Sequence, residues 1–220
     1  MIARDDRNFL KACVSISLLS ACVPAVSSLA MAGETGPICQ TQTACINVLV
    51  INTARVPEDT VSVALDRAEL IFRSAGVRLI WVSRAKGSPQ QTASPDSRSD
   101  SAGMLVLRII SQPLSGFATP DSLGLAVVAG EGSKYASVFR DRILAATRGG
   151  RYSAGMLMGH AIAHELGHLL LGTSAHTRYG LMAGLWRTNE LDRAEVGLLQ
   201  FSPAEAARLR SESLRRTTDK

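Results

Sequence analysis

The spacing of apolar residues divides the first part of the chain into two short strands separated by a helix. Residues 45–53 (CINVLVINT) form an apolar, β-branched run that is typical of a buried strand. Apolar residues then recur at helical spacing over 61–75, after Pro57 and before Gly76, which favour the start and the end of a helix. The apolar run 77–82 follows at once and predicts a second strand.

The rest of the chain changes from strands to helices. Further short apolar runs predict strands at 104–110, 123–129 and 134–139. Helical spacing predicts a long apolar helix over 152–171, followed by helices over 190–199 and 203–213. The segment 84–103 is rich in Ser, Pro, Gln and Asp and predicts a mobile surface loop. This order is typical of an α+β domain with a mixed sheet.

Length and composition indicate one globular domain. A chain of 220 residues with 46% hydrophobic and 20% charged residues is long enough for one well-buried core. We expect this domain over 45–213, with a short extension at 33–44 and a tail at 214–220. The net charge of +5 is modest, the basic residues are scattered and aromatic residues make up 5%, which argues against a nucleic-acid partner. The densest basic group is interpreted as a solvated helix face and consists of Arg208, Arg210, Arg215 and Arg216.

The N-terminal segment 1–32 has the pattern of a secretory signal peptide. Its charges end at Lys11, an apolar run follows, and the small-residue pattern Ala30-Met31-Ala32 precedes Gly33. The expected protein is therefore exported, either to a periplasm or to the medium. The segment 19–22 (LSAC) resembles a bacterial lipobox, so lipid anchoring at Cys22 is the alternative. No later stretch approaches the ~20 apolar residues that a membrane span requires.

Two cysteines remain after such processing. In an oxidising compartment Cys39 and Cys45 are expected to form a disulfide bond. The alternative is a pair of independent thiols, with Cys45 buried at the start of a strand.

All four histidines of the chain lie between residues 160 and 176, and two of them flank a glutamate in a helical turn. His164 and His168 are four residues apart, which places both imidazoles on one side of the predicted helix, as a Zn²⁺ ion requires. Glu165 follows the first histidine, where its carboxylate reaches water near the metal instead of the metal itself. The alternative interpretation is a buried helix with ordinary core histidines.

The run HELGHLLLGTSAHTRYGLM resembles the signature of metzincin-type zinc peptidases. The resemblance implies a zincin-like fold with an active-site helix, Zn²⁺ ligands His164, His168 and His176, and Glu165 as general base. It also implies Met182 as the apolar floor under the metal. The spacing departs from the family: Gly172 and His176 follow His168 by four and eight residues, against three and six in the usual pattern. A helix longer by one residue and a longer turn would compensate.

Other residues compete for places around this site. Glu190, in an Asn-Glu segment, resembles the third ligand of thermolysin-like peptidases and is the rival of His176. His160 lies one turn before His164 and is too far from His168 to share an ion, so it is expected to pack near the site. The strand that contains Gly124, Leu125 and Ala126 resembles the edge strand along which such enzymes align peptides, although an ordinary buried strand fits equally well.

These features together predict an exported zinc-dependent endopeptidase that acts on a peptide or protein substrate. Glu165 takes a proton from the attacking water and passes it to the departing amine. Two other functions share part of the pattern: a non-catalytic exported zinc-binding protein and a zinc amidase acting on cell-wall peptides. Structural zinc sites usually have four protein ligands and are rich in Cys, which disfavours the first of these.

Overall fold

The structure is a computed structural model, and it describes residues 44–83, 103–113, 118–119, 121–129 and 132–218. The predicted signal peptide 1–32, the lipobox residue Cys22, Cys39 and nearly all of the predicted loop 84–103 lie outside the described residues.

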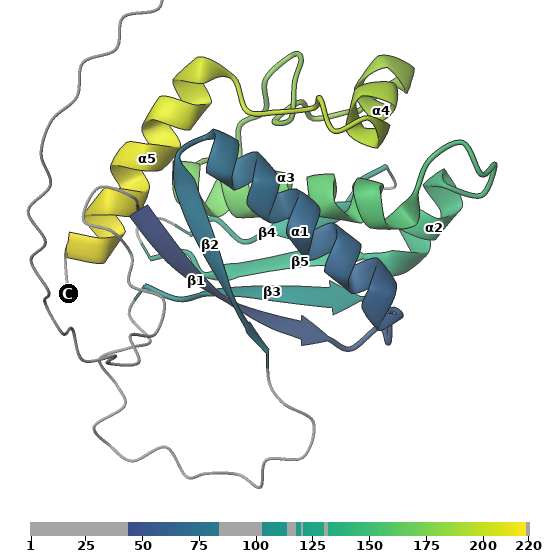
Figure 1. The fold of residues 1–220 in the computed structure, drawn as a ribbon, viewed down its shortest axis with the longest axis horizontal. Helices are drawn as coiled ribbons and strands as arrows, with labels where there is room; N and C mark the ends of the chain where they lie inside the picture. Colours follow the sequence, from purple (N-terminus) through teal and green to yellow (C-terminus); the bar gives the residue numbers. More distant parts are fainter. Residues whose placement is uncertain (1–43, 84–102, 114–117, 120, 130–131, 219–220) are drawn as a thin grey trace, which may run out of the picture. The chain divides into compact units, whose positions relative to one another are not determined.

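Five strands form one mixed sheet (Figure 1). The strands are β1 (Ala44–Asn52), β2 (Val77–Ser83), β3 (Leu105–Ile110), β4 (Gly124–Ala126) and β5 (Tyr135–Phe139). Their order in space is β2-β1-β3-β5-β4. The first four strands of this order are parallel, whereas β4 pairs antiparallel with β5 and ends the sheet on that side. The sheet therefore ends in a short antiparallel edge strand at residues 124–126, one of the two interpretations that the sequence allowed.

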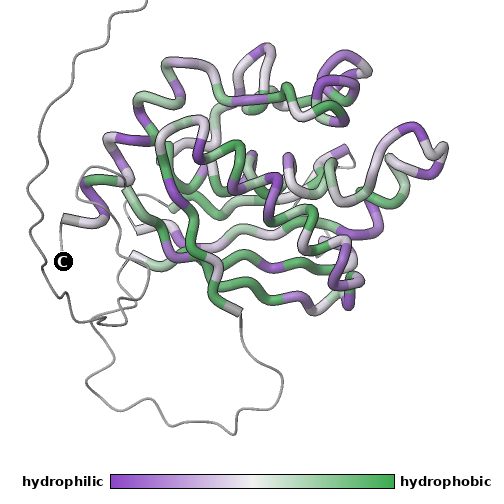
Figure 2. The backbone as a smooth tube through the Cα atoms, in the orientation of Figure 1, coloured by the Kyte–Doolittle hydropathy of each residue, from purple (hydrophilic) through white to green (hydrophobic). Residues whose placement is uncertain are grey.

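Alternating burial along the strands defines one face of the sheet as the core. In β3, Leu105, Leu107 and Ile109 are fully buried, whereas the residues between them are partly or fully exposed. This alternation follows from the pleat, which points successive side chains to opposite faces. Figure 2 shows the hydrophobic residues concentrated in the strands and on the inner sides of the helices.

Two long helices, α1 (Glu58–Ser74) and α3 (Ala154–Leu171), cover this face and pack against each other (Figure 1). Glycines in α3 allow the close approach. A Cβ atom at Gly159 would lie 2.6 Å from the Cβ of Arg67 and 2.7 Å from the Ala64 carbonyl oxygen, and one at Gly155 would lie 2.8 Å from Val63 Cγ1. Any larger residue at either position would push α3 away from α1, so these glycines help to set its position.

Three shorter elements complete the domain: α2 (Arg140–Ala146), α4 (Thr188–Glu195) and α5 (Pro203–Thr218). Several bounds differ from the prediction. Strand β4 covers three residues of the predicted 123–129, and α4 ends before the predicted residue 199. Helix α5 continues through the predicted tail to residue 218. Within the residues described, no helix combines the length and apolarity that crossing a membrane requires.

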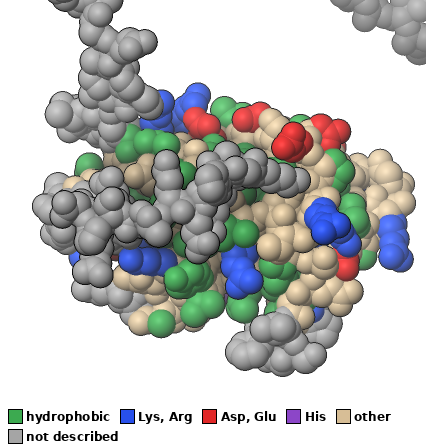
Figure 3. Space-filling model, turned by 90° about the horizontal axis from the view of Figure 1, so that it is seen from below, with side chains coloured by type: hydrophobic (Ala, Val, Ile, Leu, Met, Phe, Trp, Pro, Cys, Tyr) green, Lys and Arg blue, Asp and Glu red, His purple; other side chains and the backbone are tan. Residues whose placement is uncertain are grey.

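The basic residues of α5 were predicted to form a solvated face, and Arg208, Arg210 and Arg215 are exposed, whereas Arg216 is partly buried. Three of these guanidinium groups also bind backbone oxygens. Arg210 Nη1 donates to the Ala75 carbonyl oxygen at 3.0 Å, and Arg216 Nη2 donates to the Leu169 carbonyl oxygen at 2.6 Å. Arg208 Nη2 donates to the Leu171 carbonyl oxygen at 3.2 Å. These guanidinium groups bind backbone oxygens of α3 and of the end of α1 because charged donors stabilise the free carbonyls of helix C-termini. On the face of the domain seen in Figure 3, basic side chains lie among hydrophobic ones.

Cys45 is half-buried near the start of β1 and is disulfide-bonded. Its predicted partner Cys39 lies outside the described residues, so the pairing of these two cysteines stays a prediction.

Candidate metal centre

Helix α3 provides three residues of the candidate site, and all three are buried. His164, Glu165 and His168 are 8%, 6% and 5% exposed. The helix begins where the Ser153 hydroxyl accepts a hydrogen bond from Met156 N, and it ends at Gly172, which has a left-handed φ of 64°. Glycine adopts this conformation without strain, and it reverses the chain direction directly after the helix.

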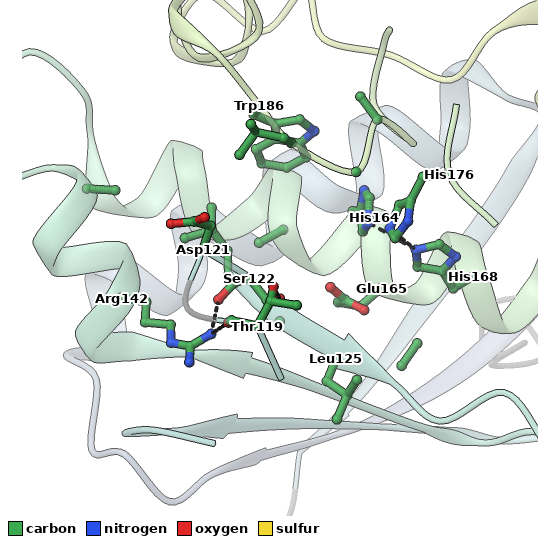
Figure 4. Close-up of a pocket in the computed structure, with 18 of the residues that line it drawn as sticks. Thr119, Asp121, Ser122, Leu125, Arg142, His164, Glu165, His168, His176 and Trp186 are labelled. Carbon is green, nitrogen blue, oxygen red and sulfur yellow. Dashed lines mark hydrogen bonds between the residues drawn. The ribbon is translucent and has the colours of Figure 1, made fainter. Parts of the chain in front are cut away.

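The turn at Gly172 returns the chain to the helix, so that three histidines converge. His168 Nε2 lies 3.0 Å from His164 Nε2 and 3.2 Å from His176 Nε2. Figure 4 shows the three rings pointing toward one another beside Glu165. The helix ends one residue later than the metzincin spacing requires, and the longer turn brings His176 back, as the sequence predicted.

Hydrogen bonds on the far side of two rings fix their protonation. Nδ1 of His164 lies 2.7 Å from the Leu181 carbonyl oxygen, and Nδ1 of His168 lies 2.7 Å from the Thr173 carbonyl oxygen. Since a carbonyl oxygen only accepts, each Nδ1 carries the proton and each Nε2 presents its lone pair to the centre. Burial lowers the pKa of His164 to about 3 and also lowers the pKa of His168, so both rings are neutral at pH 7.

This donor set fits a zinc ion. Three ligand atoms of His164, His168 and His176 lie within 4.8 Å of one another. Neutral imidazole nitrogens at this separation repel one another unless a cation lies between them, and three protein ligands with one open position are typical of catalytic zinc sites. Metal-binding histidines usually donate their other ring N–H to a carbonyl or carboxylate oxygen, and the hydrogen bonds from Nδ1 of His164 and His168 to backbone carbonyls follow this pattern.

Met182, the predicted apolar floor, packs against α3 at Gly167, the residue before His168. It is buried, and a Cβ atom at Gly167 would lie 2.9 Å from its sulfur. Its carbonyl oxygen accepts a hydrogen bond from Thr177 N at 2.9 Å, which ties the residue after His176 to this turn. Gly184 also contributes, because a Cβ atom there would lie 3.1 Å from His176 Cγ. Gly184 could not be identified from the sequence, because its contact with His176 depends on the folded turn.

Glu165 is held against the edge strand, next to the histidines. Its carboxylate accepts a hydrogen bond from the Ala126 backbone N–H, and burial raises its pKa to about 8. Gly124 makes room for it: a Cβ atom there would lie 2.6 Å from Glu165 Cγ and 2.7 Å from both Glu165 Oε1 and the Ser137 carbonyl oxygen. A buried carboxyl group with a pKa near neutrality suits a general base.

The two rival residues have other roles in the described structure. Glu190 Oε2 accepts a hydrogen bond from Arg187 N at 3.1 Å and caps the start of α4, and Glu190 is not part of the converging group. His160 is fully buried, and its Nδ1 donates to the Met156 carbonyl oxygen at 2.8 Å. Burial lowers the pKa of His160 to about 4. The ring packs edge-on against Trp186, as expected for a residue packed near the site.

A cavity of about 660 Å³ begins at the histidines and Glu165 and extends along β4 toward α2 (Figure 4). Apolar residues line much of its wall, among them Leu125, Ala161, Trp186 and Leu191. Polar groups lie toward α2, where Arg142 donates to the carbonyl oxygens of Thr119 and Ser122. Most of these lining residues carried no signal in the sequence.

Comparison with known proteins identifies the fold. No family model matches the sequence, and no curated protein matches it. A zinc-dependent peptidase from Methanocorpusculum labreanum superposes with a TM-score of 0.52 at 16% identity, covering 74% of this chain and 99% of that one. Archaemetzincin from Methanopyrus kandleri superposes with a TM-score of 0.52 at 19% identity, covering 81% of this chain and 99% of that one.

The fold is zincin-like. This result confirms the fold class predicted from the sequence, an α+β arrangement of a mixed sheet with a histidine-bearing helix and a helical C-terminal part. At these identities the likeness concerns the fold, and the chemistry follows from the residues themselves.

Proposed function

We propose that this protein is an exported, zinc-dependent endopeptidase. The observation that supports it most is the convergence of three Nε2 atoms within hydrogen-bonding distance, directly beside a buried glutamate. The two similar folds are those of a zinc-dependent peptidase and an archaemetzincin, which agrees with this chemistry.

His164, His168 and His176 would hold Zn²⁺, which supplies Lewis acidity and lowers the pKa of water. Glu165 accepts the proton of the attacking water and passes it to the departing amine. Its buried position beside the histidines lets it hold that proton between the two steps. A structural zinc site would have no use for a buried carboxyl group in this place.

Strand β4 is the proposed support for the substrate backbone. Leu123 O accepts from Phe139 N, and Val127 N donates to Tyr135 O, each at 2.9 Å. In an antiparallel pair, bonded positions alternate with positions whose groups point outward. The backbone groups of Gly124 and Ala126 therefore face away from β5, toward the cavity. The Ala126 N–H already donates to Glu165, and an extended peptide can pair antiparallel with the remaining groups.

The apolar part of the cavity is proposed to take a large apolar side chain of the substrate. Trp186, Leu125 and Leu191 line it, and the small Ala161 leaves room between them. Burial of such a side chain stabilises the complex by roughly 1.5 to 3 kcal/mol.

Export is proposed on the pattern of segment 1–32, with cleavage after Ala32. Intact mass of the protein purified from its native host decides the matter. A chain that begins at Gly33 supports soluble export, whereas a lipid-modified Cys22 would make the protein membrane-anchored.

Metal analysis combined with a peptide-library cleavage assay tests the enzyme proposal. Purified protein should bind close to one equivalent of zinc and cleave peptides in a zinc-dependent way. Glu165→Gln should keep the zinc and lower hydrolysis by ~10² or more, because it removes the proton acceptor and no ligand. His176→Ala should lose both zinc and activity.

Glu190→Ala is the matched control, because this side chain caps α4 away from the histidines. Zinc loss in Glu190→Ala together with zinc retention in His176→Ala would contradict the ligand assignment. If Glu165→Gln cleaves every peptide as fast as the wild type, Glu165 is not the general base. If the zinc-loaded wild type cleaves no peptide, a non-catalytic zinc-binding protein is the better description. Cleavage restricted to cell-wall peptides would indicate an amidase.

A further inference from the structure

Trp186 lies beside the candidate metal centre, although its position in the sequence gives no sign of this. It follows the turn that contains Met182, and it lines the cavity together with His164 and Glu165. Figure 4 shows its ring above the cavity, on the same side of α3 as His164.

The indole shares a hydrogen-bond acceptor with the first histidine. Trp186 Nε1 donates to the Leu181 carbonyl oxygen at 3.1 Å, and His164 Nδ1 donates to the same oxygen at 2.7 Å. A carbonyl oxygen has two lone pairs, so it can accept both bonds at once. The hydrogen bond from Trp186 therefore holds the Leu181 carbonyl group in the orientation in which it accepts from His164 Nδ1.

The ring also packs against two successive turns of α3. Its centroid lies 5.7 Å from that of His164 and 6.5 Å from that of His160, and both pairs meet edge to face at 85° and 87°. Edge-to-face contacts of this kind fix the relative orientation of aromatic rings. Trp186 therefore limits the rotation of His164 in two ways, through the shared carbonyl and through direct packing.

We propose that Trp186 is a positioning residue that joins the substrate cavity to the first metal ligand. Its ring forms part of the cavity wall, and its N–H group holds the Leu181 carbonyl that fixes the tautomer and the angle of His164. This proposal rests on the proposed function for the identity of the metal. It concerns how this chain orients a ligand, and it does not alter the ligand set.

Replacement of Trp186 by phenylalanine tests the role of the N–H group. The Trp186→Phe variant has no donor for the Leu181 carbonyl oxygen but keeps an aromatic ring in the cavity wall, so the fold should remain. Loss of an outer partner of a metal ligand typically lowers metal affinity 10- to 100-fold. We expect Trp186→Phe to weaken zinc binding about 10-fold, measured by competition with a chelator, with an unchanged circular dichroism spectrum.

Trp81→Phe is the matched control. The chain contains two tryptophans, and Trp81 lies on β2, at the other edge of the sheet from β4. This variant should bind zinc like the wild type. Equal zinc affinities for Trp186→Phe and the wild type would overturn the positioning role, while zinc binding and cleavage by the wild type would leave the proposed function intact.

The Trp81→Phe variant also permits a spectroscopic test that leaves the site unaltered. Trp186 is then the one indole, and zinc that orders His164 should change its fluorescence emission, with saturation at one equivalent and reversal by a chelator. Bound zinc at one equivalent with no change in emission would contradict the coupling between Trp186 and His164. A wild-type protein that binds no zinc would instead refute the proposed function.

Discussion

At the scale of single residues, the missing side chain of Gly124 allows the proposed base to reach its place. Strand β4 passes so close to Glu165 that a Cβ atom at position 124 would overlap its side chain and the Ser137 carbonyl oxygen. Because one of these neighbours is backbone, the overlap cannot be relieved by a side-chain rotation alone. Gly124→Ala should therefore displace β4 or Glu165, cost about 1 to 3 kcal/mol of stability and lower hydrolysis at least 10-fold.

Gly149→Ala is the control for this substitution, since a Cβ atom there would meet no atom within 4 Å. Thermal unfolding and peptide hydrolysis of both variants can be compared directly. Wild-type activity in Gly124→Ala would show that Glu165 does not depend on the close approach of β4.

The raised pKa of Glu165 predicts how the stability of the metal-free protein depends on pH. Burial raises this pKa from 4.5 to about 8, so the folded state holds a proton that the unfolded state has lost between these values. The contribution of Glu165 to stability is therefore complete below pH 4.5 and is lost as the pH rises to about 8. His160 and His164 act in the opposite direction, because their lowered pKa values make the folded state lose stability as the pH falls below 6.5.

The two effects separate above about pH 7.5, because histidines whose unfolded-state pKa is 6.5 are then about nine-tenths deprotonated in both states. As the pH rises from about 7.5 to 8, the metal-free protein should become less stable, which denaturant unfolding in the presence of a chelator can measure. Glu165→Gln should remove this decline, because glutamine does not ionise. A decline of the same size in Glu165→Gln would assign it to another group.

The residues of the site differ in how far the sequence could predict them. His164, Glu165 and His168 share one helical turn, so their spacing alone predicts their proximity. His176 joins them through the turn at Gly172, and the choice between His176 and Glu190 needed the folded loop, because either spacing can return a side chain to the helix. Trp186 contacts the site through a backbone carbonyl group. Every residue has such a group, so the sequence contains no motif that predicts this contact.

At the scale of elements, α5 stabilises the end of the helix that carries the site. Arg216 is 12% exposed on its side chain, and it donates to the Leu169 carbonyl oxygen in the last turn of α3 while pairing with Glu212. A charged hydrogen bond to a carbonyl contributes roughly 1.5 to 3 kcal/mol. Arg216→Ala should lower the free energy of unfolding by about this amount and loosen the segment that leads to His176.

Arg215→Ala is the comparison for Arg216→Ala, since Arg215 also pairs with Glu212 but its side chain is 44% exposed. Exposed ion pairs contribute at most about 1 kcal/mol, so a smaller loss is expected. Denaturant titrations of the two variants provide the measurement. Equal losses would indicate that Arg216 stabilises the protein through Glu212 and not through α3.

The long elements and the strands β2, β3 and β5 were predicted within a few residues, whereas β4, α2 and α4 were not. β1 and α1 have clear apolar periodicity because each buries one face, whereas α3 is apolar and buried on all sides over most of its length. Strand β4 is shorter than the apolar run around it, because pairing with β5 and contact with Glu165 determine where it ends. Helix α2 starts directly at the end of β5 with no glycine or proline between them, so the sequence offered no boundary.

At the scale of the whole molecule, the order of strands and helices along the chain was enough to predict an α+β domain with a mixed sheet, and the resemblance of the histidine motif implied its zincin-like form. The sheet order itself could not be predicted, because β1 lies between β2 and β3 in the sheet, and which strands become neighbours depends on packing. The order of the elements does explain where the site lies. Helix α3 follows β5 and α2 in the chain and lies next to β4, so that residues of both α3 and β4 line one cavity.

The cysteines provide a further test at this scale. Cys45 is disulfide-bonded at the start of β1, and an oxidised state fits an exported protein. Thiol titration of the mature protein should detect no reactive cysteine before reduction and two after it. Two reactive thiols in the unreduced protein would refute the pairing of Cys39 with Cys45.

The shortness of β4 has a consequence for the turnover of peptides. Three residues provide few outward-facing backbone groups, and one of these, the Ala126 N–H, is already occupied by Glu165. A bound peptide can therefore form few main-chain hydrogen bonds, each contributing only about 1 kcal/mol. Most of the affinity must come from the side chain buried in the cavity, so once the bond is cut, the fragment without that side chain should leave first.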